Sequence, residues 1–460
     1  MNTMKFVNRK SELAELNELE ALAKKKLFVI ALYGLRRVGK TRLLLEFLKN
    51  KGMYFFVNKN KTSADLLSEF QGILRQGKIL KELEVLDSWD KFFETLITRE
   101  APPIVFDEFQ NFTSVEPAVF GILQKTIDLN ENKPGLIILS GSLIGLIKKL
   151  FKSSKEPLYG RIKKGKRLEP LTLISCLEIG EELKLTKENL VKAYMLFGGY
   201  PKYYVALEDF NLQGKSAEEM IDALFLVKDA PLEDEVNSIL SQEFGGRSGV
   251  YYSILEAIAT GNNTLSSIAG YLNTPATSIT RQINELRDHF ELIELEMPYQ
   301  GKRGIYCIRH PLIEFWFSQI YKNFSDYAAR RPEFIASVKK NLNVLYGRCF
   351  EQVAKEFLVR ELKLTEARCQ WGKIPQAKKG ENTYEIDLIA KNEKSTYAFE
   401  FKWGELTYSE AISVMCKLQG KVKNVLRLPK DLRFGIVAKK IKDKQKLRAK
   451  GYLTYDVDDF

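Results

Sequence analysis

The feature that most constrains the fold is one stretch near the N-terminus, LFVIALYGLRRVGKTRLLLEFLKN. The run Leu27–Tyr33 is apolar throughout, as is typical of a strand buried on both faces of a parallel sheet. Leucine and phenylalanine then recur at helical spacing after Thr41. The stretch therefore predicts a strand, a loop and a helix in the order found in α/β nucleotide-binding folds.

The loop has the spacing GxxxxGK[ST] of a phosphate-binding P-loop. Its glycines let successive backbone N–H groups point at phosphate oxygens, and the following helix adds the positive end of its dipole. Lys40 is expected to reach the β and γ phosphates of ATP, and the Thr41 hydroxyl to hold Mg2+. The predicted nucleotide-binding residues of this loop are Gly34, Leu35, Arg36, Arg37, Val38, Gly39, Lys40 and Thr41.

Two further strand ends predict the rest of this site. In PPIVFDEFQNF a short apolar strand ends in Asp107, expected to hold Mg2+ through water, and Glu108, expected to polarise the attacking water. In GLIILSGSLIG the next strand ends in small polar residues, and Ser142 is predicted to sense the γ-phosphate. An acidic pair after a core strand is common, but its position downstream of a P-loop favours the functional interpretation.

The middle of the chain predicts helices followed by a helix-turn-helix unit. Residues 171–244 suit a helical lid, and the sequence from Ser248 onward predicts three short helices and a two-stranded wing. On the third helix Arg281 is expected to face outward with Ser278, Gln282 and Glu285, while Ile279, Ile283 and Leu286 pack inward. Such a helix contacts DNA in some proteins and serves as a packing module in others, and the wing residues Lys302 and Arg303 favour DNA slightly.

The stretch YEIDLIAKNEKSTYAFEFKW predicts two short strands. Read with period two, Glu385 and Asp387 share one side of the first strand, and Glu400 and Lys402 share one side of the second. The simplest interpretation is an amphipathic hairpin with one solvated face. The alternative is that these charged side chains form a site.

Composition and charge place further bounds on function. The 460 residues suit several domains, and the N-terminus lacks signal-peptide features, so a cytoplasmic protein without membrane segments is expected. Five scattered cysteines support neither disulfides nor a zinc site. Between Lys421 and Lys450 there are twelve Lys or Arg and two Asp, against a net charge of +12 for the whole chain. This basic segment is either solvated surface or a contact for a phosphate backbone.

In this order, the motifs resemble the archaeal-type ATPases, an AAA-related P-loop class. FVNRKSEL, which contains Arg9 and Glu12, is similar to the opening box that packs against adenine in that family. YGRIKKGKRLEPL is similar to the stretch after the sensor strand, which implies that Arg161 contacts the γ-phosphate. FGGYPKYY resembles the lid motif, which implies that Gly199 and Pro201 lie close to the nucleotide.

The predicted hairpin resembles the PD-(D/E)xK site of restriction-endonuclease-like domains, which this family carries at its C-terminal end. The resemblance implies that Glu351, Asp387 and Glu400 hold Mg2+ and that Lys402 positions the attacking water. Ile386 stands where the family pattern has proline. A nuclease-like fold can keep these residues and only bind DNA, so the fold and the cleavage activity are separate hypotheses.

The sequence thus predicts an α/β protein with a P-loop NTPase parallel sheet, a helical lid, a winged helix and a C-terminal α/β nuclease-like domain. The expected bounds are 1–170, 171–244, 245–334 and 335–460. The expected function is that of an ATPase that binds ATP and Mg2+ and acts on or binds DNA, with Mg2+-dependent DNA cleavage at the C-terminal site and assembly into a homo-oligomer left open. The alternatives are a nucleotide-gated switch acting on a protein partner and a DNA-binding regulator that does not cleave.

Overall fold

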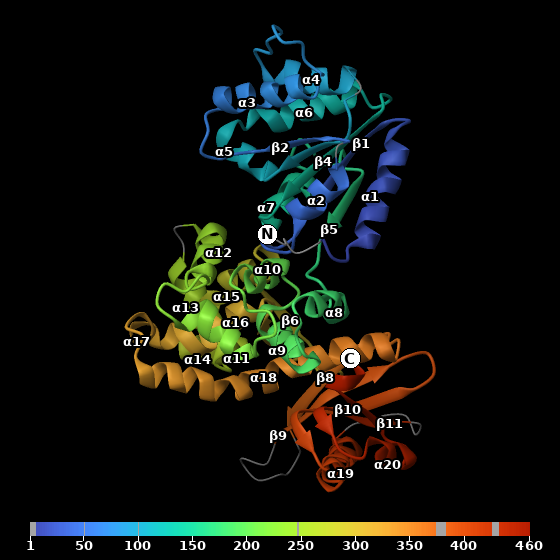
Figure 1. Ribbon diagram of the computed structural model, residues 1–460, viewed down its shortest axis with the longest axis vertical. Helices are drawn as coiled ribbons and strands as arrows, with labels where there is room; N and C mark the ends of the chain where they lie inside the picture. The colour runs from blue at the N-terminus through green and yellow to red at the C-terminus, as the bar shows by residue number, and fades with distance from the viewer. Residues whose placement is uncertain (1–5, 50, 100, 246–247, 374–382, 426–431) are drawn as a thin grey trace. The chain divides into compact units, whose positions relative to one another are not determined.

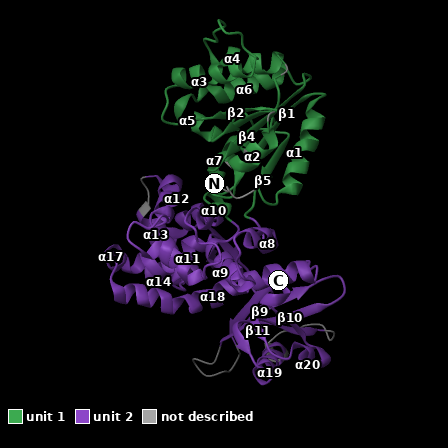
Figure 2. Cartoon of the chain, in the orientation of Figure 1, with its two compact units in different colours: residues 1–170, 200–202, 288–291 green, residues 171–199, 203–287, 292–460 purple. Residues whose placement is uncertain are grey.

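The computed structural model describes residues 6–49, 51–99, 101–245, 248–373, 383–425 and 432–460 (Figure 1). These residues divide into two compact units (Figure 2). Unit 1 comprises residues 1–170 with the short segments 200–202 and 288–291. Unit 2 comprises residues 171–199, 203–287 and 292–460. The four predicted domain bounds are finer than this division and stay predictions.

Unit 1 is built on a five-stranded sheet in the order β2-β3-β4-β1-β5, in which every neighbouring pair is parallel. Its strands are β1 (Leu27–Tyr33), β2 (Met53–Phe56), β3 (Ile104–Asp107), β4 (Gly135–Gly141) and β5 (Lys164–Arg167). Its helices are α1 (Lys10–Ala23), α2 (Lys40–Leu48), α3 (Ser63–Gln76), α4 (Trp89–Thr98), α5 (Phe112–Val115), α6 (Ala118–Leu129) and α7 (Ile144–Lys152). The predicted P-loop NTPase sheet is confirmed.

The parallel arrangement sets where the functional side chains of unit 1 meet. Strands β1 and β4 pair in register from Leu27 and Gly135 to Tyr33 and Gly141. The carboxyl ends of parallel strands lie at one edge of the sheet, so the P-loop after β1 shares that edge with the ends of β3 and β4. Strand β1 is continuously apolar because it is covered on both faces.

Unit 2 begins with helices, as predicted. They are α8 (Leu173–Glu182), α9 (Lys187–Phe197), α10 (Pro201–Asp209), whose first two residues belong to unit 1, α11 (Ala217–Ile221) and α12 (Glu235–Phe244). The predicted three helices and two strands follow as α13 (Ser248–Ala259), α14 (Leu265–Tyr271), α15 (Ala276–Asn284), β6 (Ile293–Glu296) and β7 (Ile305–Ile308). Strands β6 and β7 are antiparallel, and Thr264 caps α14.

The C-terminal part of unit 2 is a second five-stranded sheet in the order β12-β11-β10-β9-β8. Its elements and the helices before it are α16 (Pro311–Phe315), α17 (Phe324–Ala328), α18 (Pro332–Glu361), β8 (Glu366–Lys373), β9 (Thr383–Lys391), β10 (Thr396–Leu406), α19 (Tyr408–Val425), β11 (Arg433–Ile441), α20 (Lys444–Ala449) and β12 (Leu453–Asp456). Strands β8, β9 and β10 are antiparallel neighbours, whereas β10, β11 and β12 run parallel.

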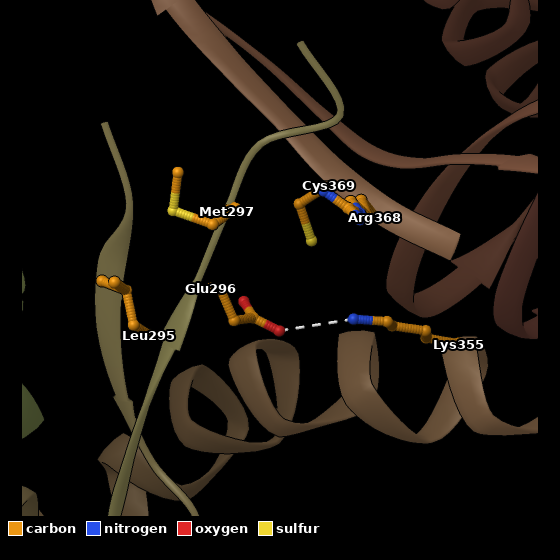
Figure 3. A pocket seen from close by; sticks show the side chains of 6 residues that line it. All are labelled: Leu295, Glu296, Met297, Lys355, Arg368 and Cys369. Atoms are coloured by element: carbon orange, nitrogen blue, oxygen red, sulfur yellow. Dashed lines mark hydrogen bonds and ion pairs between the residues drawn. The ribbon is translucent and has the colours of Figure 1, made fainter. Parts of the chain in front are cut away.

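The loop between β6 and β7 lies along the edge strand β8. Tyr299 N–H donates to the carbonyl of Cys369 at 2.9 Å, and the Trp371 indole N–H donates to the carbonyl of Arg303 at 3.2 Å. Between β6, α18 and β8 a cavity of about 290 Å³ is lined by Leu295, Glu296, Met297, Lys355, Arg368 and Cys369 (Figure 3). Its central charges are paired, because Lys355 contacts Glu296 at 3.3 Å.

The predicted hairpin is present as β9 and β10, but a solvated charged face is not. Asp387 and Glu400 are only 9% and 7% exposed, because α19 packs against β9, β10 and β11. The simplest interpretation of this stretch is therefore wrong at these two residues. Among the described helices, none is both long and apolar enough to cross a membrane.

Candidate functional site

The P-loop of unit 1 holds its lysine inside the loop. Lys40 is 6% exposed, and its Nζ donates to the carbonyls of Gly34 at 2.8 Å and Leu35 at 3.0 Å. Gly39 precedes α2 with φ 91°, a conformation that glycine adopts without strain. A Cβ at Gly39 would lie 3.6 Å from Pro201 Cγ. The structure thus brings Pro201 beside the loop, and its predicted nearness to the nucleotide stays a prediction.

Arg9 ties the start of α1 to the same loop. Its guanidinium is buried and donates to the carbonyls of Val38 at 3.1 Å and Glu169 at 2.7 Å, and to the Glu12 carboxylate at 2.8 Å. Charge-assisted bonds from a rigid planar donor fix these three partners in place. The predicted opening box is therefore attached to the P-loop, and its contact with adenine stays a prediction.

The predicted magnesium residues of unit 1 lie side by side. Thr41 Oγ1 donates to Asp107 Oδ2 at 2.6 Å, and the Tyr54 hydroxyl donates to the same oxygen at 2.8 Å. Burial, with the charge of Asp107, raises the pKa of Tyr54 well above its usual value. The sequence does not single out Tyr54, because an aromatic residue in a strand is ordinary. The nearness of Tyr54 to Asp107 depends on the pairing of β2 with β3.

Glu108 and Ser142 are also brought together. The Ser142 hydroxyl donates to Glu108 Oε2 at 2.9 Å, and the Gln110 side-chain amide donates to the same oxygen. Glu108 has φ 52°, a left-handed conformation that costs a non-glycine residue about 1–2 kcal/mol. Gln110 was missed by the sequence analysis, since a glutamine two residues after an acidic pair has no distinct spacing signal.

Arg161 lies at the amino edge of the sheet, opposite the edge that carries the P-loop. This corrects the contact with the γ-phosphate that the resemblance implied. Its guanidinium pairs with the Asp128 carboxylate at 3.0 and 3.1 Å. Residue Lys163 bonds to Val29 near the beginning of β1, whereas the P-loop follows the end of that strand. Because β5 runs parallel to β1, the segment just before β5 is placed at the amino edge, away from the predicted γ-phosphate position.

The C-terminal sheet of unit 2 gathers the second set of charged residues. The pairing of β9 with β10 ends at Leu388, opposite Phe399, and Asp387 and Glu400 each lie next to this pair in their own strands. Lys402 Nζ lies 3.0 Å from Glu400 Oε1 and 3.9 Å from Asp387 Oδ2. Asp387 Oδ2 also accepts from the N–H of Phe401 at 2.6 Å. The predicted neighbourhood of Asp387, Glu400 and Lys402 is therefore present.

Lys421 is a further member of this set. It lies on α19, and its Nζ is 3.2 Å from Glu400 Oε1. Two ammonium groups therefore contact one buried carboxylate. In the sequence Lys421 stands out only as the start of the basic segment, because its contact with Glu400 depends on how α19 packs on the sheet.

Comparisons with known proteins identify the chain. A model of an ATPase domain found predominantly in Archaea matches residues 6–207, and a model of archaeal and bacterial proteins of unknown function matches residues 316–414. An uncharacterised protein of Methanocaldococcus jannaschii is 31% identical over 465 residues, which cover 99% of this chain and 100% of the relative. The chain belongs to the archaeal-type ATPase family.

One solved structure supports the fold of the ATPase. The Walker-type ATPase of Pyrococcus abyssi matches with a TM-score of 0.54 and 22% identity, over 68% of this chain and 96% of that chain. The ORC2 protein of Aeropyrum pernix, solved as ADPNP and ADP complexes, gives a TM-score of 0.47 with 14% identity, over 74% of this chain and 96% of that one. The first likeness supports the fold, and the second is too low to carry a conclusion.

Glu351 lies within reach of the charge of Asp387. Burial, followed by this charge, raises the pKa of Glu351 to about 8. Burial and Glu400 raise the pKa of Asp387 to about 6. Within the described ranges, no group of three or more His, Cys, Asp or Glu is arranged to hold a metal, so the three carboxylates predicted for Mg2+ are not gathered at one site in this structure. The role of Glu351 as a further Mg2+ ligand stays a prediction.

The basic segment of the ATPase is largely paired where it is described. Lys439 contacts Glu188 at 3.0 Å, Lys444 contacts Asp456 at 2.8 Å, and Lys440 pairs with Asp458. These carboxylate partners lie outside residues 421–450. The excess of Lys and Arg within that segment is therefore larger than its unpaired positive charge. Arg427 and Lys430 lie outside the described residues.

Proposed function

We propose that this ATPase acts on DNA, and that its C-terminal sheet carries a Mg2+-dependent site for phosphodiester hydrolysis. The observation that carries the proposal is that buried Asp387 and Glu400, on neighbouring strands, share one lysine, with Lys402 Nζ 3.0 Å from Glu400 and 3.9 Å from Asp387. Two carboxylates and a lysine in this arrangement suit hydrolysis of a phosphate ester better than a structural role, because a buried like-charged pair is costly.

The chemistry of the donors fits Mg2+ in both units. In unit 1 Thr41 and Asp107 would hold the ion beside ATP, and their 2.6 Å hydrogen bond supports this fit. In unit 2 Asp387 and Glu400 would hold it, since both offer hard carboxylate oxygens. When bound there, Mg2+ supplies charge stabilisation at the phosphate. Lys402 orients the attacking water and stabilises its deprotonated form.

Contact with DNA is supported by side chains that remain exposed around the helix-turn-helix unit. Ser278 and Arg281 are exposed on α15, whereas Ile279 and Ile283 are buried, as predicted. On the loop between β6 and β7, Lys302 and Arg303 are exposed. Arg281 also pairs with Glu285 at 2.9 Å, so its availability to DNA requires that this exposed pair opens.

A plasmid-nicking assay tests the site. Asp387→Asn should abolish Mg2+-dependent nicking by the purified ATPase and leave ATP turnover unchanged. Glu385→Gln is the matched control, because Glu385 lies two residues away on the same strand with an exposed side chain. Equal nicking by Asp387→Asn and the parent would refute the assignment of this site.

One observation favours a second candidate, a nucleotide-controlled DNA-binding regulator that does not cleave. Lys402 and Lys421 both contact Glu400, so two tethered cations already neutralise the carboxylates. Mn2+ titration calorimetry separates the candidates. Cleavage requires that the parent binds Mn2+ and that Lys421→Met binds it more tightly, because one competing ammonium is gone. The regulator is supported if the parent protein binds duplex DNA, leaves that DNA intact and takes up no Mn2+ in unit 2.

A further inference from the structure

We propose that Gln110 is a positioning residue for ATP hydrolysis, which acts by orienting the carboxylate of Glu108. The proposal goes beyond the DNA-directed function and rests on the assignment of Glu108 as the group that activates water. Three observations of unit 1 carry it: the convergence of two donors on one oxygen, an unsatisfied buried amide oxygen, and a glycine that leaves room for the amide.

The first observation concerns Glu108 itself. Gln110 Nε2 and Ser142 Oγ both donate to Oε2 of Glu108, from the segment after β3 and from the end of β4. Two donors on one oxygen fix the rotation of the carboxylate, and so they fix the direction in which Oε1 is presented. In hydrolysis the water oxygen bonds to the γ-phosphorus, the bond from phosphorus to the β–γ bridging oxygen breaks, and the water proton passes to this carboxylate.

The second observation separates a positioning role from a structural one. Gln110 is 1% exposed, and within the described residues its Oε1 has no hydrogen-bond partner. An unsatisfied buried carbonyl oxygen is destabilising, whereas an apolar side chain of the same length would pack there without that cost. Stability alone therefore disfavours glutamine at this residue. The amide is useful at its other end, where Nε2 meets Glu108.

The third observation is the space that the amide occupies. A Cβ at Gly141 would overlap Gln110 Oε1. Gly141 is the last residue of β4 and directly precedes Ser142. Glycine at this residue therefore lets the Gln110 amide and the Ser142 hydroxyl approach Glu108 together. Gly141→Ala should displace Gln110, and with it Ile147, whose Cδ1 would lie 2.6 Å from the new Cβ, while the three polar side chains keep their chemistry.

The same unit provides a matched control glutamine. Gln71 is also buried, at 6% exposure, but both ends of its amide are satisfied by the backbone of Leu86, at 3.0 Å and 2.8 Å. It is a structural glutamine. Gln71→Met should therefore lower the unfolding midpoint and leave kcat per folded molecule unchanged. Gln110→Met should instead lower kcat per folded molecule and leave the unfolding midpoint no lower than that of the parent.

The test measures steady-state ATP turnover, ATP affinity and thermal unfolding of the full-length protein. Gln110→Met and Gln110→Glu should each lower kcat about 10- to 100-fold, since a positioned general base contributes about 10²–10⁴ in rate. The ATP dissociation constant should stay within about twofold of the parent, because the change is not at the P-loop. Gly141→Ala should lower kcat in the same way, with Gly121→Ala as its control, because a Cβ at Gly121 meets nothing within 4 Å.

A double-mutant comparison decides whether Gln110 acts through Glu108. In a Glu108→Gln background, Gln110→Met should cause no further loss of kcat. Losses that multiply would overturn the proposal, as would a Gln110→Met variant with kcat within twofold of the parent while Glu108→Gln is inactive. Full activity of Glu108→Gln would instead overturn the assignment of Glu108 itself, and with it the proposal. Neither result bears on the DNA-directed site, which is read by nicking.

Discussion

Replacing Arg9 by methionine should loosen the P-loop and destabilise unit 1. The substitution keeps most of the side-chain length but removes the guanidinium that bonds Val38, Glu169 and Glu12 at 2.7–3.1 Å. Loss of one partner from a buried ionic pair costs about 3–5 kcal/mol. The Glu12 side chain keeps 16% exposure and a hydrogen bond from Ser11, so we expect a smaller loss of about 2–4 kcal/mol.

Thermal unfolding and titration with a fluorescent ATP analogue measure the two consequences. A loss of this size corresponds to a fall of about 5–15 °C in the unfolding midpoint for a unit of this length. ATP affinity should fall about tenfold, because the carbonyl of Val38 is no longer anchored and the loop must be ordered on binding. Lys10→Met, at an exposed neighbouring residue, is the control. An Arg9→Met midpoint within about 2 °C of the parent, with unchanged ATP affinity, would refute this reasoning.

Three further outcomes are expected. Lys40→Ala should lower ATP turnover at least about 100-fold with an unchanged circular-dichroism spectrum, and normal turnover would contradict the assignment of the P-loop. His310, whose pKa burial lowers to about 3, is neutral in the fold, so its own contribution to stability should fall as pH drops below about 6.5, whereas the raised pKa values of Glu351 and Asp387 act in the opposite direction. In urea unfolding, the stability of the parent relative to His310→Gln should therefore fall by about 2 kcal/mol between pH 7 and pH 5, and a constant difference would contradict a neutral buried His310. The double variant Lys440→Gln, Lys444→Gln should have a lower free energy of unfolding, because both lysines pair with carboxylates. Its DNA affinity in fluorescence anisotropy should be unchanged. A smaller dependence of log DNA affinity on log salt concentration would show instead that these lysines contact phosphates.

The sequence predicts the central elements well where one local pattern suffices. The strand Leu27–Tyr33 is found with the expected bounds, because a strand buried on both faces has a continuous apolar run. Short-range periodicity also predicts the order of strand, P-loop and helix. It predicts the two strands around Asp387 and Glu400 as well. These features depend on residues that are neighbours in the chain.

Side chains contributed by packing could not be predicted in the same way. Tyr54 reaches Asp107 only because β2 pairs with β3, and Lys421 reaches Glu400 only because α19 packs on β10. Arg161 was assigned from a short motif whose position in the sheet the motif does not fix. Its place at the amino edge follows from β5 running parallel to β1.

The loop between β6 and β7 also has a consequence for solubility. Strand β8 ends its sheet, and an uncovered edge strand offers backbone N–H and carbonyl groups to strands of other molecules. The bonds from Tyr299 to Cys369 and from Trp371 to Arg303 occupy part of this edge. Shortening that loop should therefore promote self-association through β8 at high protein concentration, whatever its effect on DNA.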